Sequence, residues 1–323
     1  MIGNVIGVAA SAAAILSTTA IFIRHLTQAY GIPALVLAFW RDGFVCLTLL
    51  PVLALVRPAL LRLERRHLPY LVLYGLMLAT FNATWTLSVA LNGAAVATVL
   101  VYCSAGFTAL LGWRLLGERL GWGKLLAVAL SLGGCALVSG ALDPRAWRAN
   151  LLGILTGVLS GLGYAGYSLM GRTAARRGLN PWATVLATFG FASVFLLAVN
   201  LVSGGVVPGA AAHPAELLWL GKAWGGWLVL FLLAAGPTVA GFGLYNVSLS
   251  YLPSSIANLV VSVEPALTAA TAYVLFGERL TATQFAGSAM ILGAVAFLRA
   301  YEAWLEGQVA SEPAVCAERM PTE

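Results

Sequence analysis

Charged residues and clusters of catalytic side chains are scarce in this chain. Only 9% of its 323 residues are charged, and its three histidines, His25, His67 and His213, lie far apart in sequence. They form no HExxH motif and no Ser/His/Asp-like constellation, and no GxxxxGK[ST] nucleotide-binding loop is present. These absences argue against metal-dependent hydrolysis, serine-type catalysis and ATP-driven work. We therefore expect neither an enzyme nor a bound cofactor or metal.

Cysteine pairs and basic runs are missing as well. The four cysteines, Cys46, Cys103, Cys135 and Cys316, show no CxxC spacing, and three of them stand inside apolar segments. This argues against a disulfide framework or a zinc site. The net charge is +6, yet no basic run is interleaved with aromatic residues. We therefore expect no nucleic-acid partner.

Hydrophobic residues make up 60% of the chain, against about 45 to 50% in soluble domains. That excess predicts an integral membrane protein, whose length is counted in spans of about 20 residues. The first apolar run lacks a basic flank, so we expect a first span rather than a cleaved signal peptide. Ten apolar runs can be placed, at 3–23, 33–56, 68–91, 94–113, 122–141, 151–171, 181–203, 224–247, 254–276 and 281–300.

The distribution of Lys and Arg predicts the orientation, because loops rich in these residues stay in the cytoplasm. With both termini inside, most of them fall in cytoplasmic connections, above all in the segments 57–66 and 172–177. An even number of spans satisfies this arrangement. We therefore predict a multi-pass protein of the cytoplasmic (inner) membrane, embedded in the lipid bilayer, with both termini in the cytoplasm.

A charged hexapeptide occurs twice, as LLGERL at 115–120 and as LFGERL at 275–280, so the offset is 275 minus 115, or 160 positions. The same offset superposes further identical residues, namely Ser88 on Ser248, Ala97 on Ala257, Val101 on Val261, Thr108 on Thr268 and Gly133 on Gly293. The pattern indicates a duplication. Each half then holds five spans, and an odd number inverts the second copy in the membrane.

The predicted fold is therefore all-α, with ten transmembrane helices in two inverted five-helix repeats. Residues 1–142 form the first repeat, 143–150 an outer linker, 151–300 the second repeat and 301–323 a cytoplasmic tail that we expect to be disordered after a short helix end. Inverted repeats are typical of secondary transporters, because two similar halves of opposite orientation give inward-open and outward-open states of similar energy.

Two segments carry a resemblance to a known family. They read LLGERLGWGKLLAVALSLGGCALV and LFGERLTATQFAGSAMILGAVAFL, each with a GERL motif before a final span that contains glycine. Over residues 4 to about 299 the chain resembles the EamA-type transporters of the drug/metabolite transporter superfamily. The resemblance implies a ten-helix 5+5 inverted fold, cytoplasmic termini and movement of small metabolites, often outward. The chain departs from the pattern in one place, because Pro265 precedes the second motif whereas Ala105 stands before the first.

Three ionisable residues, Arg41, Asp42 and Glu264, are predicted at membrane depth, where a charge is costly unless it faces a partner or water. Glu264 is a candidate to bind a substrate ammonium group or to exchange a proton. Its alternative role is a carboxylate tied to a neighbouring helix for packing. Arg41 is a candidate for an anionic substrate group or for pairing with Glu264. The alternative for Arg41 and Asp42 is that both side chains reach the outer interface.

Aromatic and amide side chains inside the predicted spans supply walls and fixed polar groups for a cavity that holds an amphipathic metabolite. Trp85 and Tyr245 are 160 positions apart (245 minus 85), so they occupy equivalent places in the two halves. For any single residue, the alternative is a lipid-facing or interhelical position. Together with Glu264 and Arg41, the predicted substrate-binding residues are Trp40, Asn82, Trp85, Tyr102, Tyr164, Tyr167, Tyr245, Asn246 and Asn258.

Glycine spacing predicts close helix packing in one span. Gly153, Gly157 and Gly161 recur every four residues on one face of a predicted helix, which permits close approach of a neighbour.

The GERL motifs are interpreted as corners between the last two helices of each half, where Gly ends a helix and the charges reach water or neighbouring helix ends. A gating ion pair is the alternative role for those charges. The hydroxyls of residues 17–19 are further candidates to line the path, unless they bond their own helix.

The function predicted from the sequence is secondary transport of a small amphipathic metabolite, an amino acid or related compound, by alternating access and in the direction of export. Coupling to protons would run through Glu264, and without it the protein would be a facilitator. The protein would act as a monomer or homodimer. One alternative is an intramembrane enzyme on lipid-linked substrates, which would need a cluster of His, Asp or Cys that the sequence does not offer. The other is a non-transporting membrane subunit.

Overall fold

The computed structural model describes residues 2–62, 64–116, 121–138, 144–245 and 263–311, and within these ranges every regular element is a helix. The predicted all-α class is confirmed for this part of the chain. The α-helices are α1 (Ile2–Leu16), α2 (Thr19–Ala29), α3 (Ala34–Val56), α4 (Leu68–Asn92), α5 (Ala94–Val101), α6 (Ser104–Leu116), α7 (Trp122–Val138), α8 (Pro144–Arg176), α9 (Pro181–Val202), α10 (Trp224–Leu233), α13 (Glu264–Phe276) and α14 (Ala282–Ser311). The remaining elements are the 3-10 helices η1 (Pro58–Leu61), η2 (Arg65–His67) and η3 (Pro214–Leu218) and the π-helix η4 (Ala234–Gly241).

Five helical segments are long and apolar enough to cross a bilayer. They are 34–56, 65–92, 150–171, 181–202 and 224–245. Shorter apolar helices, among them 282–298, add to this set. On α3 the large side chains of Leu47, Leu55 and Val56 are exposed, as expected for a helix face that packs against lipid chains. Within the described residues, helices therefore occupy most of each predicted apolar run, while the full count of ten spans stays a prediction.

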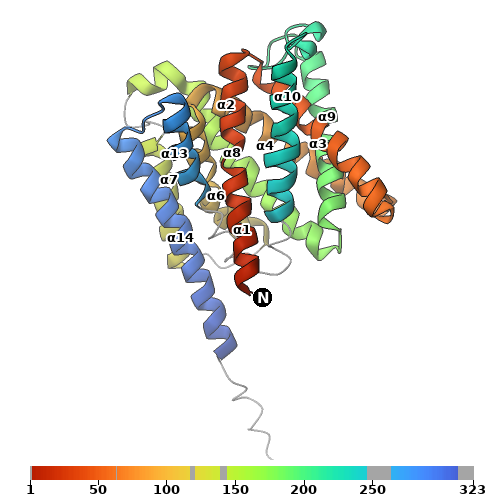
Figure 1. The fold of residues 1–323 in the computed structure, drawn as a ribbon. Coiled ribbons are helices and arrows are strands. Elements are labelled where there is room, and N and C mark those ends of the chain that lie inside the picture. The colour runs from red at the N-terminus through yellow and green to blue at the C-terminus, as the bar shows by residue number, and fades with distance from the viewer. Residues whose placement is uncertain (1, 63, 117–120, 139–143, 246–262, 312–323) are drawn as a thin grey trace, which may run out of the picture.

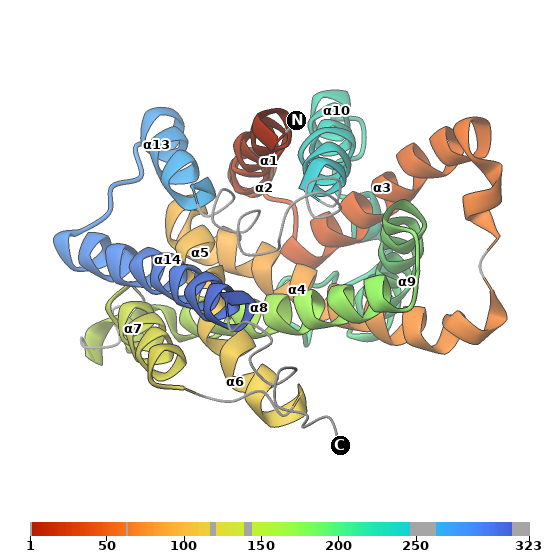
Figure 2. The ribbon, with the colours of Figure 1, turned by 90° about the horizontal axis from the view of Figure 1, so that it is seen from below.

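The arrangement of the bundle brings distant parts of the chain together. Helix α4 contacts α3, α5, α8 and α9, so it lies at the centre. Figure 1 and Figure 2 show α14 packed along α7 and continuing past the other helices, while α1 and α2 lie beside α10. Helix α13, near the end of the chain, contacts α5 from its first third.

The structure changes one predicted boundary and locates another. The segment 143–150, predicted as a linker, is helical from Pro144 and contains a kink at Asn150 (φ −148°, ψ 46°). Proline at a first helical position is preorganised for the helix, which explains this early start. The segment after residue 300 is expected to begin with a short helix end, and α14 continues to Ser311. The segment YEAWLEGQVA is rich in good helix formers, so the helix has no local reason to end at 300.

The helical path of the chain is interrupted at three places near the centre of the bundle. Helix α1 ends at Leu16 and α2 begins at Thr19, and α5 ends at Val101 before α6 begins at Ser104. Helix α10 passes into the π-helix η4, which contains Pro237. Proline lacks an N–H and its ring clashes with the preceding turn, so it widens or bends a helix.

The break between α5 and α6 occurs although the first half has no proline at the position equivalent to Pro265. Ser104, where α6 begins, and Glu264, where α13 begins, are 264 minus 104, or 160, positions apart. Pro265 stands in the first turn of α13, where its missing N–H costs no helical hydrogen bond. The first half interrupts its helix at the equivalent place with Ala105 instead of proline. The interruption therefore does not depend on proline.

Glycines permit close contacts between helices, as predicted for α8. A Cβ atom on Gly157 would lie 2.5 Å from the Leu100 side chain, and one on Gly161 would lie 2.6 Å from Sγ of Cys103. The predicted close approach of a neighbour is confirmed, and the neighbour is α5 with the turn that follows it. A second such contact joins α7 and α14, where a Cβ on Gly287 would lie 2.6 Å from the carbonyl oxygen of Gly134.

The second GERL motif forms a corner that reaches another helix. Gly277 ends α13 with a left-handed backbone (φ 66°). The carboxylate of Glu278 accepts hydrogen bonds from the backbone N–H groups of Ala94 and Ala95, both at 3.2 Å, at the start of α5. It also pairs with Arg24, 3.0 Å from Nε. The interpretation of the motif as a corner whose charge reaches a neighbouring helix end is confirmed for this copy. Glu118 and Arg119 of the first copy lie outside the described residues.

Candidate functional site

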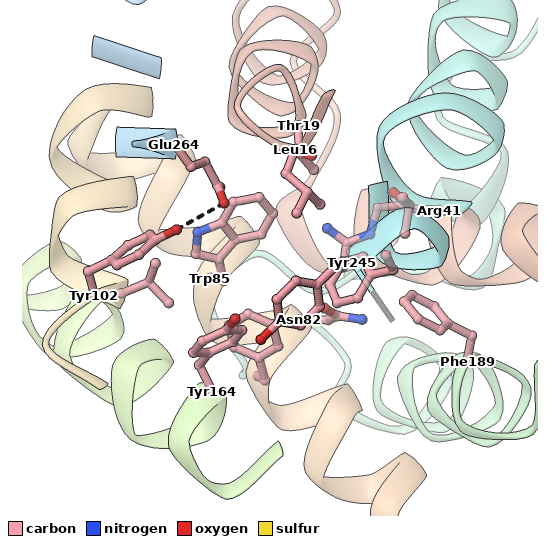
Figure 3. Close-up of a pocket in the computed structure, with 14 residues that line it drawn as sticks. Leu16, Thr19, Arg41, Asn82, Trp85, Tyr102, Tyr164, Phe189, Tyr245 and Glu264 are labelled. Atoms are coloured by element: carbon pink, nitrogen blue, oxygen red, sulfur yellow. Dashed lines mark hydrogen bonds between the residues drawn. The ribbon is translucent and has the colours of Figure 1, made fainter. Parts of the chain in front are cut away.

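A cavity lies among helices from both halves of the chain (Figure 3). The side chains that line it are Leu16, Thr19, Arg41, Phe81, Asn82, Trp85, Val101, Tyr102, Tyr164, Phe189, Thr238, Phe242, Tyr245 and Glu264. Across the described residues, no three His, Cys, Asp or Glu side chains come together as metal ligands. The charged groups at the cavity wall are one carboxylate and one guanidinium.

The acidic side of the cavity is formed by Glu264. This residue is the first of α13, and Pro265 in the same turn is buried. Its Oε2 accepts a hydrogen bond from the hydroxyl of Tyr102 at 3.1 Å. Tyr102 itself lies in the interruption between α5 and α6. Tyr102, in a helix interruption of the first half, thus holds the carboxylate of Glu264, which begins a helix of the second half.

The basic side of the cavity is formed by Arg41 on α3, whose side chain is 2% exposed. Its Nε lies 3.3 Å from Oδ1 of Asp42, which is fully buried. The amide nitrogen of Asn82 on α4 donates to both carboxylate oxygens of Asp42, at 3.0 and 2.8 Å. The ion pair of Arg41 is therefore with its neighbour and not with Glu264. The alternative that Arg41 and Asp42 reach the outer interface does not hold, because both are buried within the bundle.

Three hydrogen-bond donors at the cavity wall are buried and have no partner among the described residues. They are Oγ1 of Thr19, Nη2 of Arg41 and Nε1 of Trp85. An unmet buried donor costs about 1–3 kcal/mol, so a ligand with acceptor groups would gain by meeting them. In Figure 3 the Trp85 ring lies between the Tyr102–Glu264 pair and Arg41, and Cζ of Arg41 stands 5.7 Å from the ring centroid. The cavity therefore has an acidic pole and a basic pole with an aromatic surface between them.

Aromatic rings complete the wall. The rings of Phe81 and Tyr164 lie 5.4 Å apart, and those of Phe189 and Phe242 lie 6.0 Å apart. Such walls bury the apolar part of a ligand while the poles fix its polar ends. Behind them, Tyr167 packs 6.4 Å from Phe81 and 6.2 Å from Phe242. Tyr167 thus supports the wall without lining the cavity.

Seven of the predicted site residues are brought together at this cavity, namely Glu264, Arg41, Asn82, Trp85, Tyr102, Tyr164 and Tyr245. Tyr167 and Trp40 do not line it. Asn246 and Asn258 lie outside the described residues. The lining residues that sequence reasoning did not name are Leu16, Phe81, Val101, Phe189, Thr238 and Phe242.

Trp40 lies in a different environment because it precedes Arg41 by one helical position, about 100° around the helix. Its Nε1 donates to the carbonyl of Leu217 at 2.6 Å. Its ring packs edge-on against Trp227, with centroids 5.0 Å apart. Trp40 therefore anchors α3 to α10 and to the segment before it.

Among residues 17–19, two hydroxyls bond their own helix. Ser17 donates to the carbonyl of Ala14 and Thr18 to that of Ile15, at 2.8 and 2.7 Å. Only Thr19, the first residue of α2, reaches the cavity. The alternative reading of backbone-bonded hydroxyls thus holds for two of the three.

Comparison with known proteins identifies relatives of this chain. The EamA-like transporter family matches it twice, over residues 4–140 and 151–300. An uncharacterized transporter of Archaeoglobus fulgidus is 30% identical over 287 residues, which are 88% of this chain and 92% of that protein. The uncharacterized transporter YwfM of Bacillus subtilis is 28% identical over 234 residues, which are 69% of this chain and 71% of that protein.

A solved structure, described only as the crystal structure of a protein, has the same fold. It shares 17% sequence identity with this chain and superposes with a TM-score of 0.59. The superposition covers 92% of this chain and 97% of the solved one. At this identity the likeness concerns the fold alone. The sequence matches carry the assignment further: this chain belongs to the EamA-like transporter family of the drug/metabolite transporter superfamily, and it is a multi-pass membrane transporter.

Proposed function

We propose that this protein is a secondary transporter of a small amphipathic metabolite, an amino acid or a related zwitterion, which it exports across the cytoplasmic membrane by alternating access. One observation carries the proposal. A single cavity within the bundle holds a carboxylate, Glu264, and a guanidinium, Arg41, with aromatic rings around them. A molecule with an ammonium group, a carboxylate and an apolar side chain would match all three features.

The charged residues and three of the aromatic residues that line the cavity have distinct roles in this proposal. Glu264, with Tyr102 bound to it, receives the ammonium group, and Arg41 receives the carboxylate. Trp85, Tyr164 and Tyr245 cover the apolar part of the substrate. Asn246 and Asn258 stay predicted members of the site. Trp40 and Tyr167 act on α3 and on the wall rather than on the substrate.

The architecture that we propose is ten helices in two inverted repeats, residues 1–142 and 151–300, with both termini in the cytoplasm. The equivalent helix starts at Ser104 and Glu264 support it, because they are separated by the offset of the sequence repeat. Two similar halves of opposite orientation can rock around a site between them, which gives alternating access. In this orientation the corner at Glu278 is on the outer side.

Proton exchange is the coupling that we propose, and Glu264 is the group that would carry it. Its carboxylate is held at the cavity wall by a single described hydrogen bond, from Tyr102. A site that releases an ammonium group on one side of the membrane can take up a proton in its place. Without this exchange, the same cavity would serve a facilitator.

The experiment begins with a thermal-stability screen of the purified protein against amino acids and related metabolites, since a bound ligand raises the apparent stability. Flux of the best ligand is then measured in proteoliposomes for the wild type, Glu264→Gln, Arg41→Ala and the control Trp40→Phe. We expect flux to fall about tenfold or more in the first two variants, since hydrogen bonds to charged groups contribute about 1.5–3 kcal/mol. The control Trp40→Phe should retain the flux of the wild type. Unchanged flux in both Glu264→Gln and Arg41→Ala contradicts the proposed site.

A further inference from the structure

Asp42 does not line the cavity, yet its carboxylate accepts three described side-chain hydrogen bonds, whereas that of Glu264 accepts one. The side chain of Asp42 is fully buried, it pairs with Nε of Arg41, and it accepts two hydrogen bonds from Asn82. Asn82 comes from α4, so the pair on α3 is fixed by a second helix. The position of the Arg41 guanidinium is therefore set from outside its own helix.

The contact between Arg41 and Asp42 leaves part of the guanidinium unused. Arginine and a carboxylate commonly meet through two parallel hydrogen bonds. Here the contact is through Nε, while Nη2 is buried and has no partner among the described residues. Figure 3 shows the guanidinium directed from α3 toward the space beside Leu16 and Tyr245. A buried donor that points into a cavity is placed to receive a ligand acceptor.

Resting on the proposed function, we propose that Asp42 is a positioning residue for a carboxylate subsite: it holds Arg41 by Nε so that Nη2 takes the carboxylate of the substrate. Asn82 keeps Asp42 in place. Thr19, the other unpartnered donor on this side of Trp85, offers its hydroxyl to the same group. The subsite thus selects among substrates by the presence of a carboxylate.

The charges at the subsite define the class of anion. Arg41 and Asp42 form an ion pair, so the pair carries no net charge, although the guanidinium is the member that lines the cavity. A phosphate dianion would bring two uncompensated charges into a buried place, which is unfavourable. A carboxylate brings one, and its partner ammonium on the same molecule is matched by Glu264. The subsite therefore fits a zwitterionic amino acid rather than a phosphate ester.

The test compares three probes of the same shape by calorimetric titration of purified protein: leucine, leucinamide, which lacks the carboxylate, and 4-methylpentanoate, which lacks the ammonium group. We expect the wild type to bind leucine about tenfold or more tightly than leucinamide. Asp42→Ala reduces this preference to within about threefold, because the guanidinium is no longer held. Asp42→Asn retains part of the preference, because its amide oxygen still accepts from Nε while its amide nitrogen replaces the oxygen that accepted from Asn82 at 2.8 Å.

Two controls make the result specific. Glu264→Gln should weaken the preference for leucine over 4-methylpentanoate and leave that over leucinamide in place. If Asp42→Ala does not fold, Asn82→Ser serves instead, since it removes the two bonds that fix Asp42, and the same loss of preference is expected. An unchanged preference for leucine over leucinamide in the folded variant overturns the role of Asp42. A wild type that binds none of the three probes counts against the proposed substrate class itself, which is a different failure.

A second, independent observation concerns the corner at Glu278. Arg24 on α2 donates through Nε to Glu278 at 3.0 Å and through Nη1 to the carbonyl of Ala90, near the end of α4, at 2.9 Å. Glu278 in turn accepts from the first two N–H groups of α5. Its carboxylate meets the positive end of the helix dipole as well as Arg24. One ion pair thus joins α2, α4, α5 and the end of α13.

The same four elements line the cavity. Thr19 lies on α2, Trp85 on α4, Tyr102 directly after α5 and Glu264 at the start of α13. At 1.5 Å per residue along a helix axis, the residues that form or contact this ion pair lie roughly 7 to 21 Å from the cavity residue of the same segment. These helices cannot separate at that end without breaking the pair and exposing the N–H groups of α5.

We infer that the Arg24–Glu278 pair, with the backbone groups that it binds, is a latch that keeps one end of the cavity closed. In the proposed orientation this is the outer end. The latch opens when the transporter exposes its site to the outside, and water then replaces the partners of the two charges.

The test measures how fast a membrane-impermeant maleimide added outside labels Thr19→Cys in whole cells, compared with the parent protein. We expect Glu278→Gln or Arg24→Gln to raise the labelling rate several-fold, with Arg24→Lys in between. The control is Glu64→Gln, which removes the exposed pair of Glu64 with Arg66 and should leave the rate unchanged. Labelling at the parental rate in folded Glu278 and Arg24 variants overturns the latch. Where Glu278→Gln does not fold, Arg24→Lys decides the question.

Discussion

The hydroxyl of Tyr102 donates to Oε2 of Glu264 across 3.1 Å. The first residue lies in a helix interruption of one half of the chain, and the second begins a helix of the other half. The bond therefore joins the two halves at the cavity wall. It also limits the directions in which the carboxylate can present its remaining lone pairs.

Tyr102→Phe tests this bond. The substitution keeps the ring against the cavity and removes the donor, so the carboxylate becomes less well fixed. We expect the affinity for the best ligand of the metabolite screen to fall about tenfold, since hydrogen bonds to charged groups contribute about 1.5–3 kcal/mol. Titration calorimetry measures it. Tyr70→Phe is the control, because the Tyr70 hydroxyl donates to the carbonyl of Met170, outside the cavity lining; an equal loss in both variants would count against a specific role of Tyr102.

Trp85→Leu and Trp40→Leu form a matched pair. Both substitutions remove an indole, and both should lower the thermal denaturation midpoint because the packing of a buried ring (Trp85) or a half-buried ring (Trp40) is lost. Only Trp85 lines the cavity and lies 5.7 Å from Cζ of Arg41. We therefore expect ligand affinity to fall several-fold in Trp85→Leu and to stay near the wild-type value in Trp40→Leu. Equal ligand affinities for the two variants would show that the indole of Trp85 does not contribute to ligand binding.

The sequence predicted the charged residues of the site better than its walls. Arg41 and Glu264 stood out because a charge at membrane depth is rare, and Trp85 with Tyr245 stood out through the repeat offset. Phe242 and Thr238 gave no such signal, since Phe and Thr are common in apolar spans whichever way they face. The face that each residue presents depends on how α9 and η4 pack, and periodicity weakens in a helix that is apolar all round.

The positions of the helix breaks could not be predicted from the sequence pattern either. The interruption at Tyr102 lies within an unbroken apolar run, and no proline or polar cluster marks it. The pairing of Arg41 with Asp42 could not be anticipated from their directions on an ideal helix. A long, flexible arginine reaches back to its neighbour once Asn82 from α4 fixes the carboxylate.

Gly287→Ala should destabilise the contact between α7 and α14. The added Cβ would meet the carbonyl oxygen of Gly134 at 2.6 Å, so the two helices must move apart. We expect a cost of about 1–3 kcal/mol, as for other overpacked contacts, visible as a lower thermal denaturation midpoint. Gly293→Ala on the same helix meets nothing within 4 Å and should be neutral or stabilising by up to about 1 kcal/mol. Equal midpoints for the two variants would contradict the close packing.

Asn200 is expected to be the most sensitive amide outside the cavity. It is 1% exposed, and its Nδ2 donates to the carbonyls of Leu35 and Leu196 while its Oδ1 accepts from the N–H of Ala211. Asn200→Leu leaves the buried N–H of Ala211 without a partner, which costs about 1–3 kcal/mol, so the thermal denaturation midpoint should fall. Asn200→Asp keeps the acceptor for Ala211 and loses the two donor bonds. If both variants lose the same stability, the acceptor bond to Ala211 does not hold the loop against α9, and the donor bonds to Leu35 at the start of α3 and to Leu196 on α9 itself carry the effect.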